Sequence, residues 1–236
     1  MNTPPLPTSL TARQGEQLDE YLSLLLQAND KFNLTAIVQP DEARERHINE
    51  SLRLVPVLES LLPLQHNEPT VGRRRQVLDL GSGGGLPGMV LAITRPDLDF
   101  TLLEATEKKA GFLRETIRLL GLNHVSVECS RAEIAAAPGA KWRASMDVVT
   151  ARAVAALPTL LELAVPFLKV DGIFLAVKGE RASEELEQAK RALALLHTEC
   201  VGVERQPSAT LLLLKKTQKT SATYPRRSGE PKRKPL

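Results

Sequence analysis

Hydrophobic residues recur with two different periods along this 236-residue chain. Near the N-terminus, Leu18, Leu22 and Leu25 follow the spacing of one helix face, and a second helix is predicted over residues 41–55. Pro56 is expected to break or kink that helix. In the rest of the chain, short apolar runs alternate with amphipathic stretches, which is typical of strands that alternate with helices.

This alternation predicts the elements of one sheet and the helices between its strands. The predicted strands cover residues 77–80, 100–103, 125–128, 147–150, 173–177 and 211–214, with a further one near Val201. The predicted helices begin near Gly88 and Ala156 and cover residues 107–120 and 182–197. We therefore expect an α/β fold with a doubly wound, mostly parallel, seven-stranded sheet and an N-terminal helical extension, and a ligand at the carboxyl ends of the strands.

The stretch RRQVLDLGSGGGLPGMVLAI, residues 74–93, carries the strongest local pattern. It describes a buried strand, a glycine turn and a helix start in uninterrupted order. Glycine admits positive φ and has no Cβ, so a ligand can lie directly against the main chain of such a turn. The stretch therefore predicts a site for a nucleotide-type cofactor.

The glycines permit two interpretations. Counted from Gly83 the pattern is GxGxxG, the dinucleotide fingerprint, and counted from Gly81 it is GxGxG, the usual methyltransferase form. The second is favoured because the predicted strand stops just before Gly81. The next predicted strand ends in Glu104, whose carboxylate can accept hydrogen bonds from both ribose hydroxyls. Both cofactor classes use such an acid, so it supports a nucleoside ligand without choosing between them.

Candidate site residues are those that lie just past each predicted strand. They are Gly81, Gly83, Gly85 and Leu86 in the turn, Glu104, Ala105 and Thr106 after the second strand, Ser130, Ala132 and Glu133 after the third, Ala151 and Arg152 after the fourth, and Lys178 after the fifth. Cys129 and Cys200 are isolated, without a CxxC pair or clustered histidines. This argues against a structural metal and against a disulfide framework, and it favours a reducing compartment.

Length and composition bound the organisation of the chain. Its 42% hydrophobic residues suffice for one sizeable core. We expect a helical subdomain over residues 1–72, a nucleotide-binding domain over residues 73–216 and a basic tail over residues 217–236. The N-terminus has no apolar segment of the kind found in signal peptides, and no stretch approaches eighteen apolar residues. We expect a cytoplasmic protein, a monomer, without a membrane span.

Positive charge gathers at the C-terminus. The net charge is +3, but residues 215–236 contain eight basic residues against Glu230, a local charge of +7. The end TYPRRSGEPKRKPL has three prolines and no apolar periodicity. We expect a mobile or draped tail suited to counterion release on a phosphate backbone, with a solubilising tail as the alternative. The candidate RNA contacts are Arg226, Arg227, Lys232, Arg233 and Lys234 in the tail, and Lys178.

The segment after the fourth predicted strand, VVTARAVAAL, restricts the chemistry. It lacks the Asp or Asn followed by two prolines and an aromatic residue that amino-group methylation of adenine requires, and it lacks the cysteine nucleophile of cytosine C5 methylation. The absence of both a base and a nucleophile fits an acceptor that is already nucleophilic, such as guanine N7. Catalysis would then consist mostly of alignment.

Two other classes stay open on this reasoning. One is a nicotinamide-dependent oxidoreductase, although no His or Tyr–Lys pair follows the later strands. The other is a noncatalytic RNA-binding assembly factor whose basic tail supplies the affinity.

Five motifs resemble the ribosomal RNA small subunit methyltransferase G family, formerly glucose-inhibited division protein B. They are NLTAI at residues 33–37, RHINESL at 46–52, VLDLGSGGGLPG at 77–88, SRAE at 130–133 and DVVTARAVA at 147–155. The C-terminal YPRRSGEPKRKPL also resembles a tail found in a subset of that family. The resemblance implies a Rossmann-like class I methyltransferase fold and transfer of a methyl group from S-adenosylmethionine. The acceptor it implies is N7 of a guanine in the 530 loop of bacterial 16S rRNA, in the small ribosomal subunit or its precursor.

The resemblance also implies roles for particular residues. It puts Gly81, Leu86, Ala132, Glu133 and Arg152 at the cofactor and Glu104 on the ribose. Arg152 is a positioning candidate, and no residue is assigned as catalytic.

Three residues depart from the family pattern. Glu104 stands where Asp is more common, Glu50 replaces a usual Asp, and Gly84 occupies a position that is commonly Ala or Pro. His47 is either a structural side chain or a contact to RNA or cofactor.

Overall fold

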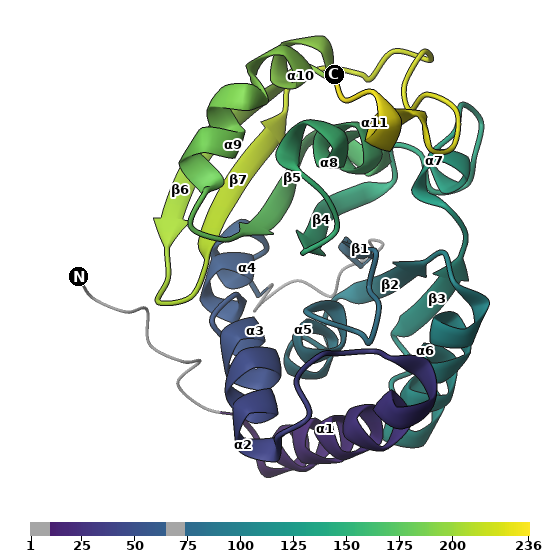
Figure 1. Ribbon diagram of the computed structural model, residues 1–236, viewed down its shortest axis with the longest axis vertical. Helices are drawn as coiled ribbons and strands as arrows, with labels where there is room; N and C mark the ends of the chain where they lie inside the picture. Colours follow the sequence, from purple (N-terminus) through teal and green to yellow (C-terminus); the bar gives the residue numbers. More distant parts are fainter. Residues whose placement is uncertain (1–9, 65–73) are drawn as a thin grey trace. The chain divides into compact units, whose positions relative to one another are not determined.

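A computed structural model describes residues 10–64 and 74–236, which form two compact units that interleave along the chain (Figure 1). The first unit comprises Met1–Arg75 and Ser82–Cys129, and the second comprises Gln76–Gly81 and Ser130–Leu236. The chain therefore passes between the units before Gln76, inside the glycine turn between Gly81 and Ser82, and after Cys129. The domain boundaries expected from the sequence, after residues 72 and 216, stay predictions.

The first unit consists of helices and two parallel strands. Its elements are α1 (Ala12–Phe32), α2 (Pro40–Ala43), the π-helical turn η1 (Arg44–Asn49), α3 (Glu50–Leu52), α4 (Val55–Leu61), α5 (Gly88–Thr94), β2 (Asp99–Glu104), α6 (Glu107–Leu120) and β3 (Val125–Cys129). α1 contacts α5 and α6, and α6 contacts both strands. The buried Leu18, Leu22 and Leu25 lie on α1, as their helical spacing predicts.

The single helix expected over residues 41–55 is divided into α2, η1 and α3. A π-helical turn carries an extra residue, which shifts the side chains that follow it around the axis. Within η1, the buried His47 lies 2.7 Å, Nε2 to Oγ1, from Thr35. Pro56 lies in the first turn of α4, where the missing N–H has no helical partner to lose. The predicted break at Pro56 is therefore a new helix start.

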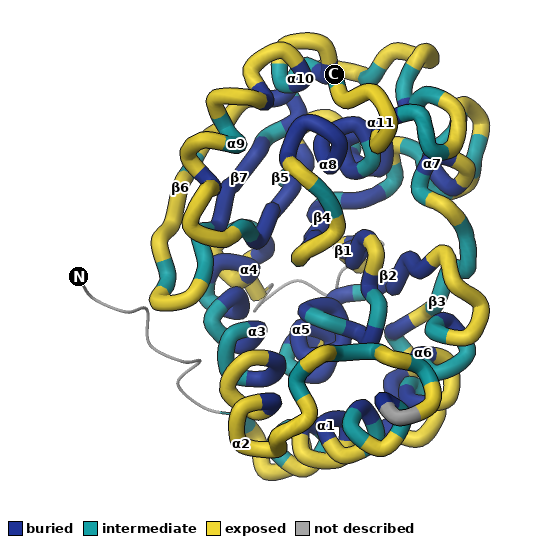
Figure 2. The backbone as a smooth tube through the Cα atoms, in the orientation of Figure 1, coloured by how far each residue is buried: buried dark blue, intermediate teal, exposed yellow. Residues whose placement is uncertain are grey.

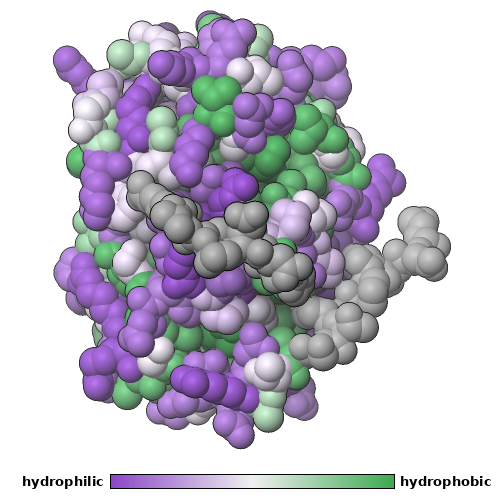
Figure 3. All heavy atoms as spheres, turned by 180° about the vertical axis from the view of Figure 1, so that it is seen from behind, coloured by the Kyte–Doolittle hydropathy of each residue, from purple (hydrophilic) through white to green (hydrophobic). Residues whose placement is uncertain are grey.

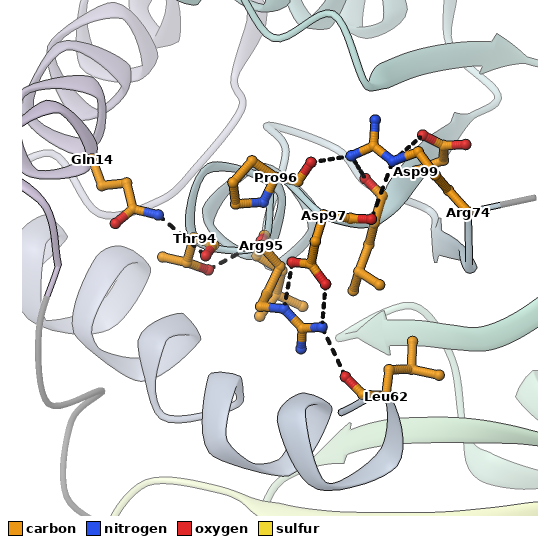
Figure 4. Close-up of polar contacts among 10 residues, drawn as sticks. Gln14, Leu62, Arg74, Thr94, Arg95, Pro96, Asp97 and Asp99 are labelled. Atoms are coloured by element: carbon orange, nitrogen blue, oxygen red, sulfur yellow. Dashed lines mark hydrogen bonds and ion pairs between the residues drawn. The ribbon is translucent and has the colours of Figure 1, made fainter. Parts of the chain in front are cut away.

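Two arginines hold the end of α5 (Figure 4). Arg95 is 2% exposed and donates to the carboxylate of Asp97 at 2.6 Å and to the carbonyl oxygen of Leu62 at 2.8 Å, which joins the ends of α5 and α4. Arg74 donates to three successive carbonyl groups after Arg95 and pairs with Asp99 at 3.3 Å. Arg95 thus satisfies a carbonyl that the end of α4 leaves without a helical partner, and Arg74 satisfies carbonyls of the loop after α5.

The second unit holds the larger part of the sheet. Its elements are β1 (Gln76–Leu80), α7 (Ala132–Ala135), β4 (Met146–Arg152), α8 (Leu157–Ala164), η2 (Val165–Phe167), β5 (Leu168–Lys178), α9 (Ala182–Gln188), α10 (Lys190–Leu195), β6 (Thr198–Arg205), β7 (Thr210–Lys216) and α11 (Glu230–Arg233). β1, β4 and β5 pair in parallel, whereas β7 is antiparallel to both β5 and β6. The helix expected over residues 182–197 is two helices, which separate at Ala189.

The seven strands follow the order β3-β2-β1-β4-β5-β7-β6. This confirms the expected α/β fold with a mostly parallel seven-stranded sheet. Within the second unit, β4, β5 and β7 are largely buried, whereas β6 is an exposed edge strand (Figure 2). Hydrophilic and hydrophobic side chains are mixed on the face that Figure 3 shows. In the second unit, the exposed hydrophobic residues include Val170, Val201 and Val203. No helix in the described ranges has the length and apolar content to cross a membrane.

Candidate functional site

The glycine turn adopts the conformation that the GxGxG pattern requires. Gly81, Gly83 and Gly85 have φ of 69°, 59° and 105°, a region that residues with a Cβ rarely adopt. Gly88 instead begins α5. The positive φ values therefore fall on the glycines of the methyltransferase pattern, and they explain why this turn tolerates no side chain at those positions.

The N-terminal helix packs against the turn. The Tyr21 hydroxyl of α1 donates to the carbonyl oxygen of Gly84 at 2.9 Å. A Cβ at Gly84 would lie 2.8 Å from Leu25 Cδ1 and 3.5 Å from Leu34 Cβ. A side chain at this position would therefore displace Leu25. The N-terminal section thus supports the turn through side chains of α1 and the loop that follows it.

Glu104 is held at the end of β2 by two backbone groups. Its carboxylate accepts from the Gly83 N–H at 3.0 Å and from the Thr106 N–H at 2.8 Å, one on each oxygen. The residue is only 7% exposed, whereas Ala105 and Thr106 are exposed. A carboxylate has about four lone-pair positions, so each oxygen keeps one for another donor. Glu104 therefore combines a fixed orientation with spare capacity to accept hydrogen bonds.

Glu133 lies in α7 of the second unit, one residue after Ala132, and its carboxylate is already engaged. It accepts from the Arg131 guanidinium at 3.0 Å and from the Gly229 N–H at 2.8 Å. Burial raises the pKa of Glu133, but the hydrogen bonds from Arg131, Gly229 and its own backbone N–H, together with the charge of Arg131, outweigh it, and the pKa lies below its ordinary value. Its partner Gly229 is 96 residues away in sequence.

Arg152 ends β4 and is half-buried. The loop that follows it begins with Ala153 at φ 56°. Beyond Arg152 lies a cavity of about 490 Å³ that is lined by Ala153, Val154, Ala155, Ala156, Arg181, Glu184, Glu185 and Gln188. A Cβ at Gly81 would lie 2.9 Å from Val154 in the same unit. The cavity is large enough for a nucleobase.

Lys178 does not present its charge to solvent. Its ammonium group lies 2.8 Å from the Glu185 carboxylate and donates to the Ala155 carbonyl oxygen at 2.9 Å, and its side chain is 9% exposed. The expectation of an RNA contact rested on its place after a strand, but the ion pair directs the side chain to α9. Lys178 instead fixes the loop that lines the cavity.

The C-terminal segment, residues 217–236, is draped over the second unit and includes α11, drawn in yellow near α8 in Figure 1. Arg226 makes a bidentate contact with the fully buried Glu162, so it is occupied within the protein. Arg226 was expected to contact RNA, but its guanidinium pairs with Glu162 because a buried carboxylate requires a cation beside it. The other four candidate residues are exposed: Arg227, Lys232, Arg233 and Lys234.

The buried residues Glu162 and Lys216 and the half-buried Arg143 had no role in the sequence-based expectations. Glu162 is the one charged residue in the apolar helix LPTLLELA, and that contrast could have marked it. Lys216 ends β7, where its ammonium group donates to the carbonyl oxygens of Val165 and Leu168. Burial and, to a smaller extent, the charge of Arg143 together lower the pKa of Lys216 to about 8.

Two of the motifs noted in the sequence meet at His47. The hydroxyl of Thr35, in NLTAI, shares a hydrogen bond with Nε2 of the His47 imidazole. The Thr35 N–H donates to Asn29 Oδ1 at 2.8 Å. The Ser51 hydroxyl of the second motif donates to the His47 carbonyl oxygen at 2.6 Å. These contacts support the structural alternative for His47, a side chain that joins η1 to the loop after α1.

Comparison with known proteins gives consistent matches in sequence. The model of a family described as rRNA small subunit methyltransferase G matches residues 14–209. The chain is 42% identical over 219 residues to ribosomal RNA small subunit methyltransferase G of Sorangium cellulosum, which covers 93% of this chain and 87% of that protein. It is 37% identical over 233 residues to the protein of the same name from Streptococcus pyogenes, which covers 97% of this chain and 94% of that one.

Solved structures share the fold. One similar structure is an O-methyltransferase from Bacillus cereus in complex with SAH, with a TM-score of 0.55, 19% identity, and coverage of 84% of this chain and 91% of that one. Another is a ribosomal protein L11 methylase from Lactobacillus delbrueckii, with a TM-score of 0.50, 14% identity, and coverage of 72% and 79%. At such identities the similarity concerns the fold alone.

Proposed function

Because the chain belongs to the rRNA small subunit methyltransferase G family, we propose that it methylates N7 of a guanine in the 530 loop of 16S rRNA, with S-adenosylmethionine as the methyl donor. Family membership makes the protein an rRNA methyltransferase. The cofactor, the position on the base and the loop are the proposed parts. The GxGxG conformation of the turn supports a methyltransferase rather than the oxidoreductase that the other pattern permits.

Glu104 carries the cofactor part of the proposal. The Gly83 and Thr106 N–H groups hold its carboxylate, and the free lone pairs on its oxygens suit the two hydroxyls of a ribose. Gly83 and Gly85 are both proposed contacts, and the nucleoside can approach the main chain of Gly83 closely because that residue has no side chain. The space where a Cβ of Gly85 would lie is taken by Tyr21, Leu113 and Met89. Leu86, Ala105 and Thr106 complete the proposed contacts in the first unit. S-adenosylmethionine supplies an activated methyl group on a sulfonium sulfur.

The family resemblance supplies the proposed contacts in the second unit, which are Gly81, Ala132, Glu133 and Arg152. Arg152 stands at the carboxyl end of β4, the end at which open α/β sheets bind ligands. We assign it a positioning role. The cavity beyond it, bounded by Arg181 and Glu184, is the proposed place of the target base.

Guanine N7 suits a protein without an assigned general base. This nitrogen has an in-plane lone pair and no proton, so it needs no deprotonation before it accepts a methyl group. The residues of this chain then have to hold the acceptor in line and exclude water. Such alignment can contribute about 7–11 kcal/mol to lowering a barrier. Exposed Arg227, Lys232, Arg233 and Lys234 are proposed to add affinity through phosphate groups, without choosing the base.

The test is transfer of labelled methyl groups to small ribosomal subunits that lack this modification. Purified protein is incubated with radiolabelled S-adenosylmethionine, and the label is mapped by strand cleavage specific for N7-methylguanine. We expect label at one guanine of the 530 loop, and its loss with Arg152→Ala. Label elsewhere would refute the proposed position, and confirmed cofactor binding without any label would refute the substrate. RNA binding without cofactor binding would indicate the noncatalytic assembly factor.

A further inference from the structure

The start of the C-terminal segment is fastened to the end of α7. Arg143 donates through Nη1 to the carbonyl oxygens of Ala136 at 2.7 Å and Tyr224 at 2.8 Å. Through Nη2 it donates to those of Thr220 at 3.1 Å and Ser221 at 3.0 Å. One guanidinium therefore connects three carbonyls of the C-terminal segment with the residue that caps α7.

The middle of the segment is anchored by a buried ion pair. Glu162 of α8 is 0% exposed and accepts from Arg226 Nε at 2.9 Å, from its Nη2 at 2.5 Å and from its backbone N–H at 2.8 Å. The same guanidinium donates to the Lys234 carbonyl oxygen at 2.8 Å. A buried carboxylate with several charge-assisted partners is a strong anchor, because losing the cation leaves an unpaired charge.

The end of the segment reaches the proposed cofactor residues. The Gly229 N–H donates to the Glu133 carboxylate at 2.8 Å, beside the contact from Arg131. Two residues later, the Pro231 carbonyl oxygen accepts from the Thr159 hydroxyl of α8 at 3.1 Å, and Pro231 is buried. α8 thus holds the segment at Pro231, and the segment in turn holds Glu133 through Gly229.

We propose that the C-terminal segment positions the cofactor-binding residues Ala132 and Glu133, and that Arg226 is a positioning residue for cofactor affinity. The inference rests on the proposed function, in which those two residues contact S-adenosylmethionine. The segment contacts α7 directly at Glu133 near its start, and Arg143 links the segment to Ala136 after the end of α7. A detached segment removes the Gly229 donor from the Glu133 carboxylate and leaves it only partners from its own stretch of chain, Arg131 and its own backbone N–H. α7 is then free to move away from the geometry that binds the cofactor.

Arg226 and its neighbour Arg227 form a matched pair for the test. Both substitutions to Met remove one positive charge from the same segment, but only Arg226 contacts Glu162, whereas Arg227 is exposed. The dissociation constant of S-adenosylhomocysteine is measured by calorimetry on the full chain, together with Tm. We expect Arg226→Met to weaken binding about tenfold and to raise KM for S-adenosylmethionine more than it lowers kcat. Arg227→Met should change the dissociation constant by less than about twofold.

Two further variants separate positioning from stability. Arg226→Lys keeps a cation beside Glu162 and should restore part of the affinity. The double variant Glu162→Gln with Arg226→Met removes both charges of the pair, so no unpaired charge is left at this position. If the single variant does not fold, the double variant is measured in its place, and it should also bind S-adenosylhomocysteine more weakly than wild type. A merely structural role would lower Tm in both single- and double-substituted proteins and leave the dissociation constant unchanged.

The outcomes distinguish the two proposals. Wild-type protein that binds S-adenosylhomocysteine, with equal affinity in the Arg226→Met and Arg227→Met variants, overturns this inference and leaves the proposed function standing. Wild-type protein that does not bind S-adenosylhomocysteine overturns the proposed function, and this inference with it.

Discussion

The glycine turn and the C-terminal segment each hold residues that we propose as cofactor contacts, but the interactions that shape them span very different distances along the chain. In the turn, positive φ at three glycines sets the path, and the anchoring Glu104 is 21 residues from Gly83. The C-terminal segment depends on Glu162, which is 64 residues from Arg226, and on Glu133, which is 96 residues from Gly229. The sequence predicts a conformation that depends on local backbone preferences. It does not predict one that depends on charge pairs between residues far apart in the chain.

The largest effect should come from breaking the anchor of the C-terminal segment. Arg226→Met leaves the buried Glu162 with only a backbone donor, and removing one partner of a buried pair costs about 3 kcal/mol of unfolding free energy. Urea denaturation measures this change. Arg227→Met is the control and should stay within about 0.5 kcal/mol of wild type. Equal stability of the two variants would mean that the segment contributes nothing to the fold.

A side chain in the glycine turn should abolish cofactor binding through a local effect, without disturbing contacts between distant parts of the chain. Gly83→Val places a β-branched residue at φ 59° and fills the space beside the main chain, so affinity for S-adenosylhomocysteine should fall about 100-fold or more. Calorimetry measures the loss.

Gly111 offers a matched control for that variant. It lies inside α6 with open space where its Cβ would be, so Gly111→Ala should keep full affinity and raise the unfolding free energy by about 0.5–1 kcal/mol. Binding that survives Gly83→Val would refute the role of the turn.

The buried Lys216 ties the stability of the second unit to pH. Burial lowers its pKa to about 8 in the folded protein, from 10.5, so between these values the unfolded chain binds more protons. The unfolding free energy of wild type should therefore rise with pH in this window, relative to Lys216→Met, by at most about 1.4 kcal/mol per pH unit. Denaturation at pH 7, 8, 9 and 10 tests this. A difference that does not vary with pH would mean that Lys216 titrates normally.

The smallest effect concerns the exposed charges of the C-terminal segment. Replacing Arg227, Lys232, Arg233 and Lys234 together by Gln should flatten the dependence of RNA affinity on salt, by a slope of about 3 or less. Filter binding of an rRNA fragment at several salt concentrations gives the slope. An unchanged slope would make these four residues a solubilising surface, and the segment would then act only through its anchors.

The hydrophobic pattern predicted the strands and most helices because each period reports which face of an element is buried. It placed α1, β1 and α6 well, since each has a local signal: helical spacing of leucines, an apolar run before glycine, and Gly121 at the end of α6. It missed the division of residues 41–55 and of 182–197. The first of these regions contains His47, which contacts Thr35 in the loop after α1 and thus a residue outside the predicted helix.

The candidate site shows the same contrast between features that a local signal predicts and features that depend on distant contacts. Gly81, Gly83, Gly85 and Glu104 carried signals in their spacing from a predicted strand. Lys178 occupies an equivalent position after a strand, but Glu185 from α9 takes up its charge. A position past a strand therefore predicts where a residue lies more reliably than what its side chain binds.

By itself, the sequence determined the alternation of strands and helices, the GxGxG turn and the acid that follows it, because backbone preference and hydrophobic period act over a few residues. Only the tertiary structure decided that Arg226 belongs to Glu162, that Gly229 holds Glu133, and that the basic C-terminus is folded onto the second unit. The physical reason is the low tolerance of a protein interior for unpaired charge. Which cation satisfies a buried carboxylate depends on the packing of elements far apart in the chain.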